Sequence, residues 1–401
     1  MSGKRFFVGI GALLAGMAIC VAASIDDTAW KILLDSPEFK AGGYSLDATV
    51  KNLKTETNLP DPELGGEYLW MPKDVDNRWA LELSWGIEWP GVYRARNKEA
   101  MAKMTAAEKA LWTQRAERLA EIKDLLLDYI RCRCKLSLLE ELAQNNDTIY
   151  RLAEDAARGG EMTVLDLNKI RLEYANIRVA KATLMDEEAE VTGQLTAILG
   201  HDPAYLLEDL DCTFPEIIWP TEQELALIKE NAPAVQKALA DSKVSKNARK
   251  VAKMEAFPSL SLGYKHAYED GMHFNGATFG ISIPILSSRG KQKAAAADVL
   301  ESEFNAGAVA LEVENDATAI LKRLRLLDMQ IKEIAPIIEN ADYNAALLKA
   351  YKGGVLTLLE YISDRNYFTN AAVELVSLRH NAAKAMALLY RYLPNPLYKA
   401  P

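Results

Sequence analysis

Between Trp79 and Trp89 the chain alternates between large apolar side chains and small or polar ones. The odd positions are Trp79, Leu81, Leu83, Trp85, Ile87 and Trp89. An amphipathic helix cannot produce a period of two, because successive side chains change sides only in an extended strand. The pattern therefore predicts a β-strand that presents every large apolar group on one face.

Three more segments alternate in the same way, though less strictly: residues 64–70, 260–265 and 277–283. Short stretches rich in Pro, Asp, Asn or Gly join them in pairs, from Pro72 to Arg78 and from Glu269 to Gly276. Such stretches are typical of turns. We therefore expect one strand hairpin in each half of the chain, at about 62–90 and 258–285.

Two long tracts predict helices. Residues 97–158 contain neither Pro nor Gly, and residues 291–352 contain only Gly307 and Pro336. Apolar residues recur at intervals of three and four residues in both tracts, which is typical of coiled-coil packing. Pro336 is expected to kink its helix or to mark a local irregularity, because proline removes a helical hydrogen bond.

A Gly-Gly pair follows each tract, at Gly159-Gly160 and at Gly353-Gly354. Glycine adopts the left-handed turn at a helix C-terminus readily, so the chain is expected to fold back there. The returning helices are predicted over 163–199 and 357–393. Each half thus closes as a helical hairpin, at about 97–199 and 291–393.

The two glycine pairs belong to an internal repeat. Asp166 matches Glu360 at the offset that relates Gly160 to Gly354 (354 − 160 = 194; 360 − 166 = 194), and Pro90 matches Pro284 at the same spacing. A constant offset indicates one structural unit built twice. We expect a first repeat at 24–200 and a second at 201–401.

The N-terminus has the form of a secretory signal peptide over residues 1–23. Lys4-Arg5 precede an apolar run that ends in small residues. A membrane anchor and a lipoprotein modified at Cys20 are alternatives. Beyond residue 23 no run approaches the ~20 apolar residues that a membrane helix requires, so any membrane entry must use strands.

Composition and chemistry exclude several functions. The net charge of −9 argues against nucleic acid as a partner. The four histidines (His201, His266, His273 and His380) are scattered, and Cys132, Cys134 and Cys212 form no metal motif or disulfide framework, so we interpret them as small buried residues. The sequence shows no catalytic arrangement, cofactor motif or metal site, and predicts that the protein is not an enzyme.

The strand pattern and the signal peptide together favour a membrane role over a soluble half-buried hairpin. Strand lengths are near the ~9–11 residues that cross a bilayer, and aromatic residues lie where membrane-interface girdles occur. Four strands cannot close a barrel, and lipid tolerates no open sheet edge. Several chains must therefore pool their strands.

The ordered set of motifs resembles the TolC-like outer-membrane efflux channels, and most closely their heavy-metal resistance branch. It comprises residues 59–64, Gly86-Ile87-Glu88-Trp89-Pro90 before Arg94-Ala95-Arg96, Phe279-Gly280-Ile281-Ser282-Ile283-Pro284, and residues 351–360. The resemblance implies a homotrimer, a twelve-stranded barrel in outer-membrane lipid of a Gram-negative bacterium, and a helical α-barrel in the periplasm. It also implies a periplasmic adaptor and an inner-membrane transporter as partners.

The same resemblance assigns roles to residues. The odd positions from Trp79 to Trp89 are expected to face lipid, and Glu67, Glu82, Ser84 and Glu88 the barrel lumen. The periplasmic gate is expected at Asp166, Glu360 and Tyr351, although Leu356 and Ser363 depart from the family's pattern, so only the location of the gate is carried over. The adaptor-docking tips would be Arg158, Gly159, Gly160 and Glu161, with Lys352, Gly353, Gly354 and Val355.

Three alternatives remain open at this point. A type I secretion outlet uses the same channel with a different pump. A periplasmic coiled-coil scaffold would pack its hairpins on its own helices and be soluble without detergent. A helical enzyme with carboxylates in a bundle core would need a Glu-x-x-His pair, which the sequence lacks.

Overall fold

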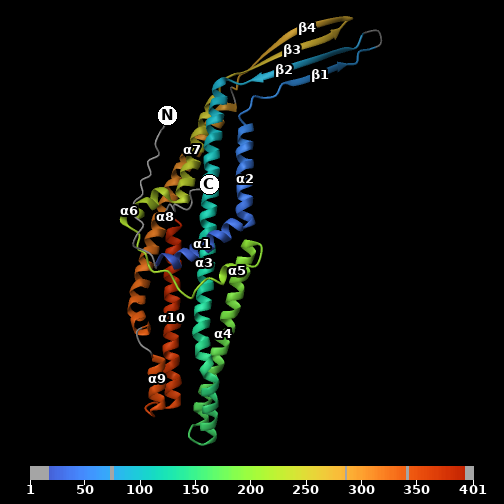
Figure 1. Ribbon diagram of the computed structural model, residues 1–401. Helices are drawn as coiled ribbons and strands as arrows, with labels where there is room; N and C mark the ends of the chain where they lie inside the picture. Colours follow the sequence, from blue (N-terminus) through green and yellow to red (C-terminus); the bar gives the residue numbers. More distant parts are fainter. Residues whose placement is uncertain (1–17, 73–75, 285–286, 340–342, 393–401) are drawn as a thin grey trace, which may run out of the picture. The chain divides into compact units, whose positions relative to one another are not determined.

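The computed structural model describes residues 18–72, 76–284, 287–339 and 343–392. Long helices and one four-stranded antiparallel sheet make up its regular structure (Figure 1). The predicted fold class, mostly helical with a small set of strands, is confirmed. Most of the predicted signal peptide lies outside the described residues, so it stays a prediction.

The chain divides into two compact units, and each draws on both halves of the sequence. The helical unit comprises residues up to Lys40, Arg115–Leu225 and the chain from Asn315 onward. The strand unit comprises Ala41–Gln114 and Ala226–Glu314. The compact units thus group residues differently from the two sequence repeats, whose boundaries stay a prediction.

The strand unit contains the whole sheet and the helices that lead into it. Its elements are most of α2 (Pro37–Thr55), then β1 (Glu63–Leu69), β2 (Arg78–Ile87), α7 (Pro233–Met254), β3 (Ser259–Glu269) and β4 (Met272–Ser282), with the first parts of α3 and α8. The sheet order is β1-β2-β3-β4, and all neighbours are antiparallel. Its central pair joins the hairpin of one half of the chain to the hairpin of the other.

The second hairpin turn is tighter than the sequence analysis predicted. Glu269 pairs with Met272, so the turn consists of Asp270 and Gly271 alone. Both residues have positive φ, 49° and 77°, which is the conformation that an Asp-Gly hairpin turn requires. Residues 272–276, expected in the loop, belong instead to β4.

The strand predicted over Trp79–Trp89 ends two residues early, at Ile87. The next residue, Glu88, forms a bidentate pair with Arg96 in the first turns of α3, and Arg96 also reaches Glu255 at 2.9 Å. Pro90 then begins the helix, where its missing N–H is not needed. Glu88 and Trp89 therefore form the strand-to-helix junction.

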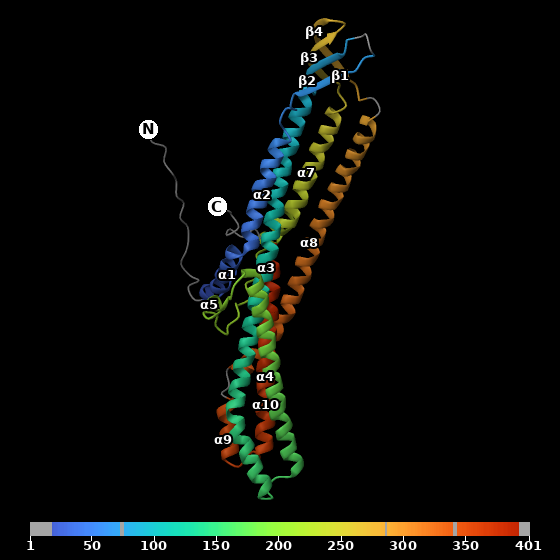
Figure 2. The ribbon, with the colours of Figure 1, turned by 90° about the vertical axis from the view of Figure 1, so that its right-hand side faces the viewer.

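Two helical hairpins form most of the helical unit. Its elements are α1 (Ala18–Asp35), α4 (Val164–Leu199), α5 (Ala204–Leu207), α9 (Tyr343–Lys352) and α10 (Leu358–Tyr390). It also contains α3 (Pro90–Arg158) from Arg115 onward, α8 (Ser287–Glu339) from Asn315 onward and the start of α6 (Glu222–Asn231). Figure 2 shows α3 beside α4, and α9 beside α10. The predicted long helices are confirmed, and the bounds of the two helical hairpins stay a prediction. The tract predicted over 291–352 appears as α8, which contains Pro336 near its end, and α9. The intervening residues 340–342 lie outside the description.

The core of this unit is an apolar cluster that joins α1, α3 and α4. Ile32, Ile122, Leu126 and Leu195 are fully buried within it. Spacing by three and four along α3 brings Leu119, Ile122 and Leu126 to one face, as the sequence pattern predicts. Burial of each such side chain contributes about 1.5–3 kcal/mol to folding.

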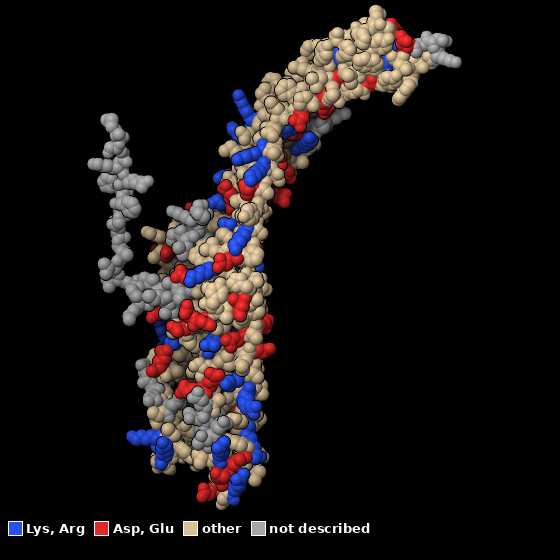
Figure 3. Space-filling view, turned by 45° about the vertical axis from the view of Figure 1, so that its right-hand side comes forward, with Lys and Arg blue, Asp and Glu red and all other residues tan. Residues whose placement is uncertain are grey.

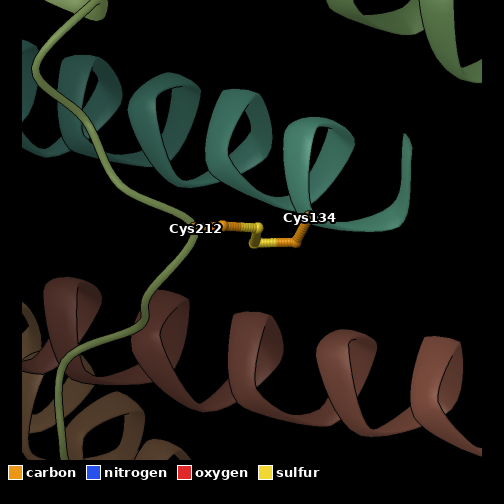
Figure 4. The surroundings of a disulfide bond; sticks show 2 residues. All are labelled: Cys134 and Cys212. Atoms are coloured by element: carbon orange, nitrogen blue, oxygen red, sulfur yellow. A yellow bond between two sulfur atoms is a disulfide. The ribbon is translucent and has the colours of Figure 1, made fainter. Parts of the chain in front are cut away.

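The cysteine interpretation was wrong for two of the three residues. Cys134 on α3 and Cys212 in the segment after α5 form a disulfide, with their Cα atoms 5.1 Å apart (Figure 4). Cys132 remains a free buried thiol. The two bonded cysteines are 78 residues apart. Because the chain folds back along α4 to bring Cys212 to α3, the pairing depends on tertiary structure and not on local spacing.

Candidate functional site

The two Gly-Gly turns have the same backbone geometry. Gly160 and Gly354 adopt left-handed φ values of 79° and 72°. At each turn the residue after this glycine donates its N–H to a carbonyl five positions back, Glu161 to Ala156 and Val355 to Ala350, both at 2.9 Å. These bonds satisfy carbonyls that the helix end would leave without partners. The two tips are thus built alike.

A threonine cap starts the returning helix at each tip. Thr163 Oγ1 accepts the backbone N–H of Asp166, and Thr357 Oγ1 accepts that of Glu360. In the second tip the cap is reciprocal, since Glu360 Oε2 accepts the Thr357 N–H at 2.9 Å. Thr-x-x-Glu is the capping-box signature, and the sequence analysis overlooked it.

This capping gives the two predicted gate carboxylates a local structural role. The hydrogen bond from the Thr163 hydroxyl, and then the bond from Lys169, lower the pKa of Asp166. The backbone N–H of Thr357, followed by its hydroxyl, lowers the pKa of Glu360. Both side chains therefore remain charged near neutral pH. Their role in a gate stays a prediction.

The predicted gate tyrosine, Tyr351, lies in a small core at the tip. Its ring stacks on Tyr361 at 5.3 Å between centroids. The core contains Leu167 and Ile170 of the first hairpin as well as Leu358 and Ile362 of the second. The two tips of one chain are therefore packed together, and the Tyr351 ring is half-buried between them.

The residues predicted as docking tips are exposed, and they have exposed apolar neighbours. Arg158, Glu161, Lys352 and Val355 are all exposed, Val355 to 77%. Val164 and Leu165, in the first turn of α4, are also more than 70% exposed. The sequence analysis missed this pair, although Val164 and Leu165 lie off the face that buries Leu167 and Ile170. Acidic and basic side chains surround the tips (Figure 3).

The sheet has two chemically different faces. Strand register places Leu83 opposite Leu64 on β1 and Tyr264 on β3, and Leu262 opposite Phe279 on β4. These side chains share one face, and Leu83 is 52% exposed on it. Of the positions expected to face lipid, Trp79, Leu81, Leu83, Trp85 and Ile87 lie on this face, while Trp89 lies beyond the strand.

The opposite face carries small and polar residues. Glu82 accepts a hydrogen bond from Thr278 at 2.8 Å, and Lys265 lies 4.0 Å from Glu67. Ser84 stands between Glu63 and Gly263 in the register. Glu67, Glu82 and Ser84, three of the predicted lumen residues, thus share a face. Glu88 lies past the end of β2.

Aromatic side chains gather at both ends of the apolar face. At the end near the Asp270-Gly271 turn, Trp79 lies 5.4 Å from His266 and 6.3 Å from Tyr268 between ring centroids. At the other end Trp89 stacks on Phe257, and Trp85 Nε1 donates to the Pro60 carbonyl. Aromatic rings with one polar edge are typical of an interface between apolar and aqueous surroundings.

Two of the histidines described as scattered come together in the second hairpin. The rings of His266 and His273 stack at 5.4 Å, and His266 Nδ1 lies 2.7 Å from Asn275 Oδ1. The strand register makes them diagonal neighbours, which the overlong predicted loop had concealed. Within the described residues there is no group of three or more side chains suited to a metal ion.

A partly buried charge cluster links α3 to α10, and the sequence analysis did not predict it. Asp128 lies 2.8 Å from His380 Nε2 and 3.0 Å from Lys384 Nζ. Burial alone would raise the pKa of Asp128, but the close contact with His380 and the hydrogen bond from Lys384 outweigh it and hold the pKa at about 2. The cluster therefore stabilises the packing of the two hairpins while Asp128 is ionised.

We expect Asp128→Asn to lower the free energy of unfolding by about 2 kcal/mol at neutral pH, as a depressed carboxyl pKa implies. The stabilisation is present above the unfolded pKa of about 3.8 and is lost as the pH falls toward about 2. Urea unfolding across this range measures it. Asp124→Asn is the control, because Asp124 also contacts Lys384 but is more exposed. Equal losses in both variants would contradict the prediction.

None of the helices in the described residues is long and apolar enough to cross a membrane. The sequence matches no protein-family model and no curated protein. Solved structures of similar fold do exist. A membrane protein from Pseudomonas aeruginosa is 14% identical, with a TM-score of 0.79 over 100% of this chain and 99% of its own.

Two further structures are described as outer-membrane channels. OprN is 14% identical, with a TM-score of 0.76 over 98% of each chain. The Campylobacter jejuni channel CmeC is 14% identical, with a TM-score of 0.75 over 92% of this chain and 85% of its own. The chain therefore has the fold of these channels, and the resemblance to the TolC-like fold is confirmed. The heavy-metal branch stays a prediction.

Proposed function

We propose that the protein is the outer-membrane channel of a tripartite efflux system in a Gram-negative bacterium. It would conduct substrates passively, after a periplasmic adaptor and an inner-membrane pump hand them over. The observation that carries this proposal is the sheet, with an exposed apolar face, aromatic ends and a polar opposite face. The fold that the chain shares with outer-membrane channels supports this proposal. The same fold favours conduction over catalysis.

We propose a homotrimer, and the edges of the same sheet support it. Within the described residues, β1 and β4 each pair with one strand only, so each leaves a row of backbone groups without sheet partners. Such edges cannot persist in lipid. Three chains that join β4 of one copy to β1 of the next would close a twelve-stranded barrel, with Glu67, Glu82 and Ser84 toward its lumen.

The internal repeat is part of the proposal. We infer two structural repeats, 24–200 and 201–401. The bounds of the elements support them: β2 begins at Arg78 and β4 at Met272 (272 − 78 = 194), and the tips at Gly160 and Gly354 differ by the same 194 residues. Each repeat would then supply one strand hairpin to the β-barrel and one helical hairpin to the α-barrel.

The helical tips are proposed as the adaptor-docking surface. Arg158, Glu161 and Lys352 offer charges there, while Val164, Leu165 and Val355 offer apolar contacts. Exposed apolar side chains with a polar rim are typical of protein interaction sites. The first tip has two exposed apolar side chains and the second has one. An adaptor would therefore find two different binding sites on each chain.

Cell fractionation with a detergent-solubilised mass tests the proposal. We expect the protein in the outer membrane as a trimer that dissociates on heating. A freely soluble monomer would instead support the coiled-coil scaffold. A type I secretion outlet would fractionate in the same way as an efflux channel, so the adaptor and pump encoded beside the channel gene separate these two.

The gate prediction can now be tested without damage to the cap. We expect Glu360→Gln to lower cation over anion selectivity severalfold in planar bilayers, because a ring of carboxylates attracts cations. The amide oxygen can still accept the Thr357 N–H, whereas Glu360→Ala would also remove the capping box. Glu374→Gln, at an exposed site further along α10, is the control. Unchanged selectivity in Glu360→Gln would remove this residue from the constriction.

A further inference from the structure

A non-helical segment crosses between the two helical hairpins. Residues 208–221, here called the strap, join α5 to α6 and contain no helix or strand. In Figure 1 the strap is the thin yellow-green segment between these two helices. Most of its residues are exposed, including Cys212. The strap therefore depends on a few specific contacts to hold its position.

Several noncovalent contacts of the strap are with helices of the second half of the chain, while Leu210 and Phe214 also pack against the apolar cluster of α1, α3 and α4. Phe214 packs edge-on against His380 of α10 at 6.2 Å between centroids. Ile217 packs on the apolar cluster of α8 and α10. The backbone of Ile218 contacts Met386 Sδ at 3.3 Å and accepts from the Tyr390 hydroxyl at 3.4 Å.

The covalent contact of the strap is with the first half of the chain. The Cys134–Cys212 disulfide attaches it to α3, as Figure 4 shows. A cavity of about 790 Å³ lies beside the bond, and both cysteines line it together with Phe214, Ile331 and Val376. A cavity of this size admits small molecules. The disulfide is therefore accessible from solvent on the strap side, although Cys134 itself is buried.

The third cysteine, Cys132, lies away from the Cys134–Cys212 disulfide. Cys132 precedes Cys134 by two residues on α3, so the two side chains leave the helix in nearly opposite directions. Cys132 is buried near Glu187, and burial raises the pKa of its thiol to about 11. A thiol in this state is a poor nucleophile, so Cys132 does not compete for Cys212.

We propose that the Cys134–Cys212 bond, which holds the strap against α3, is a site of thiol–disulfide exchange. A dithiol would attack Cys212 Sγ as a thiolate, breaking the S–S bond and releasing Cys134 Sγ, which takes a proton from water. The second thiol of the reductant then displaces Cys212 as a thiol and leaves as a cyclic or protein disulfide. Two cysteine thiols and one oxidised dithiol result.

Exchange at this site removes the covalent link between the strap and α3. In the reduced form the strap keeps the contacts of Phe214, Ile217 and Ile218 with α8 and α10 and loses its covalent attachment to α3, so only apolar packing remains on that side. The wall of the cavity between the strap and α3 can then open. Cys212 is exposed, so a dithiol can reach this bond in the folded protein, whereas a fully buried disulfide cannot be attacked without unfolding. This inference does not rest on the proposed channel activity.

The test uses the full-length protein in detergent, with dithiothreitol as the dithiol and without denaturant. After alkylation we expect mass spectrometry to find labels on Cys134 and Cys212 but not on Cys132. Hydrogen exchange in residues 208–221 should quicken at least about tenfold, with the two tips unchanged. Cys132→Ala should behave like the wild type in both measurements.

Two results would overturn the proposal. One is a bond that dithiothreitol reduces only after the protein is unfolded. The other is complete reduction of the bond with unchanged hydrogen exchange in the strap, which would mean that the bond does not control the mobility of the strap. Cys134→Ser/Cys212→Ser should reproduce the fast exchange without reductant. If that variant fails to fold, reduced wild-type protein alone decides the outcome.

Discussion

Leu83→Arg is expected to prevent stable assembly of the protein in the outer membrane. Leu83 lies in the middle of β2, on the apolar face and half-exposed. An arginine facing lipid near the bilayer midplane costs about 2–4 kcal/mol per chain. Fractionation with the amount of heat-sensitive trimer as the readout measures the effect. We expect trimer to fall to a small fraction of the wild-type amount.

Ser84→Arg is the matched control for this substitution. Ser84 is the next residue on the same strand, but it points to the opposite face, between Glu63 and Gly263. An arginine there would face the water-filled lumen and lie near an acidic side chain, so assembly should persist. If Leu83→Arg assembles normally while Ser84→Arg does not, the two faces of the sheet have been assigned the wrong way round.

The strand faces could be predicted from sequence because a period of two is a local property. Trp79, Leu81 and Leu83 alternate with Ala80 and Glu82 whatever the rest of the chain does. The pairing of β2 with β3, which joins the two halves into one sheet, needed the structure. The second turn was a different case, because Asp270-Gly271 is itself a hairpin signal that the loop prediction passed over.

The tips show that one motif can have both a structural and a proposed functional role. Asp166 and Glu360 lie in the first turns of the returning helices that the sequence predicts, and their role in a gate stays a prediction. Their hydrogen bonds to Thr163 and Thr357 follow from the Thr-x-x-Asp and Thr-x-x-Glu spacing, which was visible in the sequence. A charge at a helix N-terminus has a structural explanation before it needs a functional one.

The charge cluster and the disulfide were beyond sequence reasoning for one physical reason. Asp128 and His380 are 252 residues apart (380 − 128 = 252), and Cys134 is 78 residues from Cys212. Neither pair lies at a helical or strand spacing that would mark it. Only the packing of α3 against α10 and the path of the strap bring these groups together. The pattern of apolar and polar residues does not predict that path.

Loss of the disulfide should be the largest single effect on stability. The bond closes a loop of 78 residues that includes the end of α3, the first tip and all of α4. By loop-closure entropy, a cross-link of this length stabilises the fold by about 4 to 5 kcal/mol. Cys134→Ser/Cys212→Ser should therefore lower the thermal midpoint of helix unfolding in detergent by about 10 °C or more.

Two controls isolate the cross-link from the loss of buried sulfur. Cys132→Ser removes a buried thiol on the same helix and leaves the bond intact, so its midpoint should fall by much less. Dithiothreitol should lower the midpoint of the wild type but not that of the double variant, which has no bond to reduce. If Cys132→Ser and the double variant lose equal stability, side-chain burial on α3 and not loop closure is what the cysteines contribute.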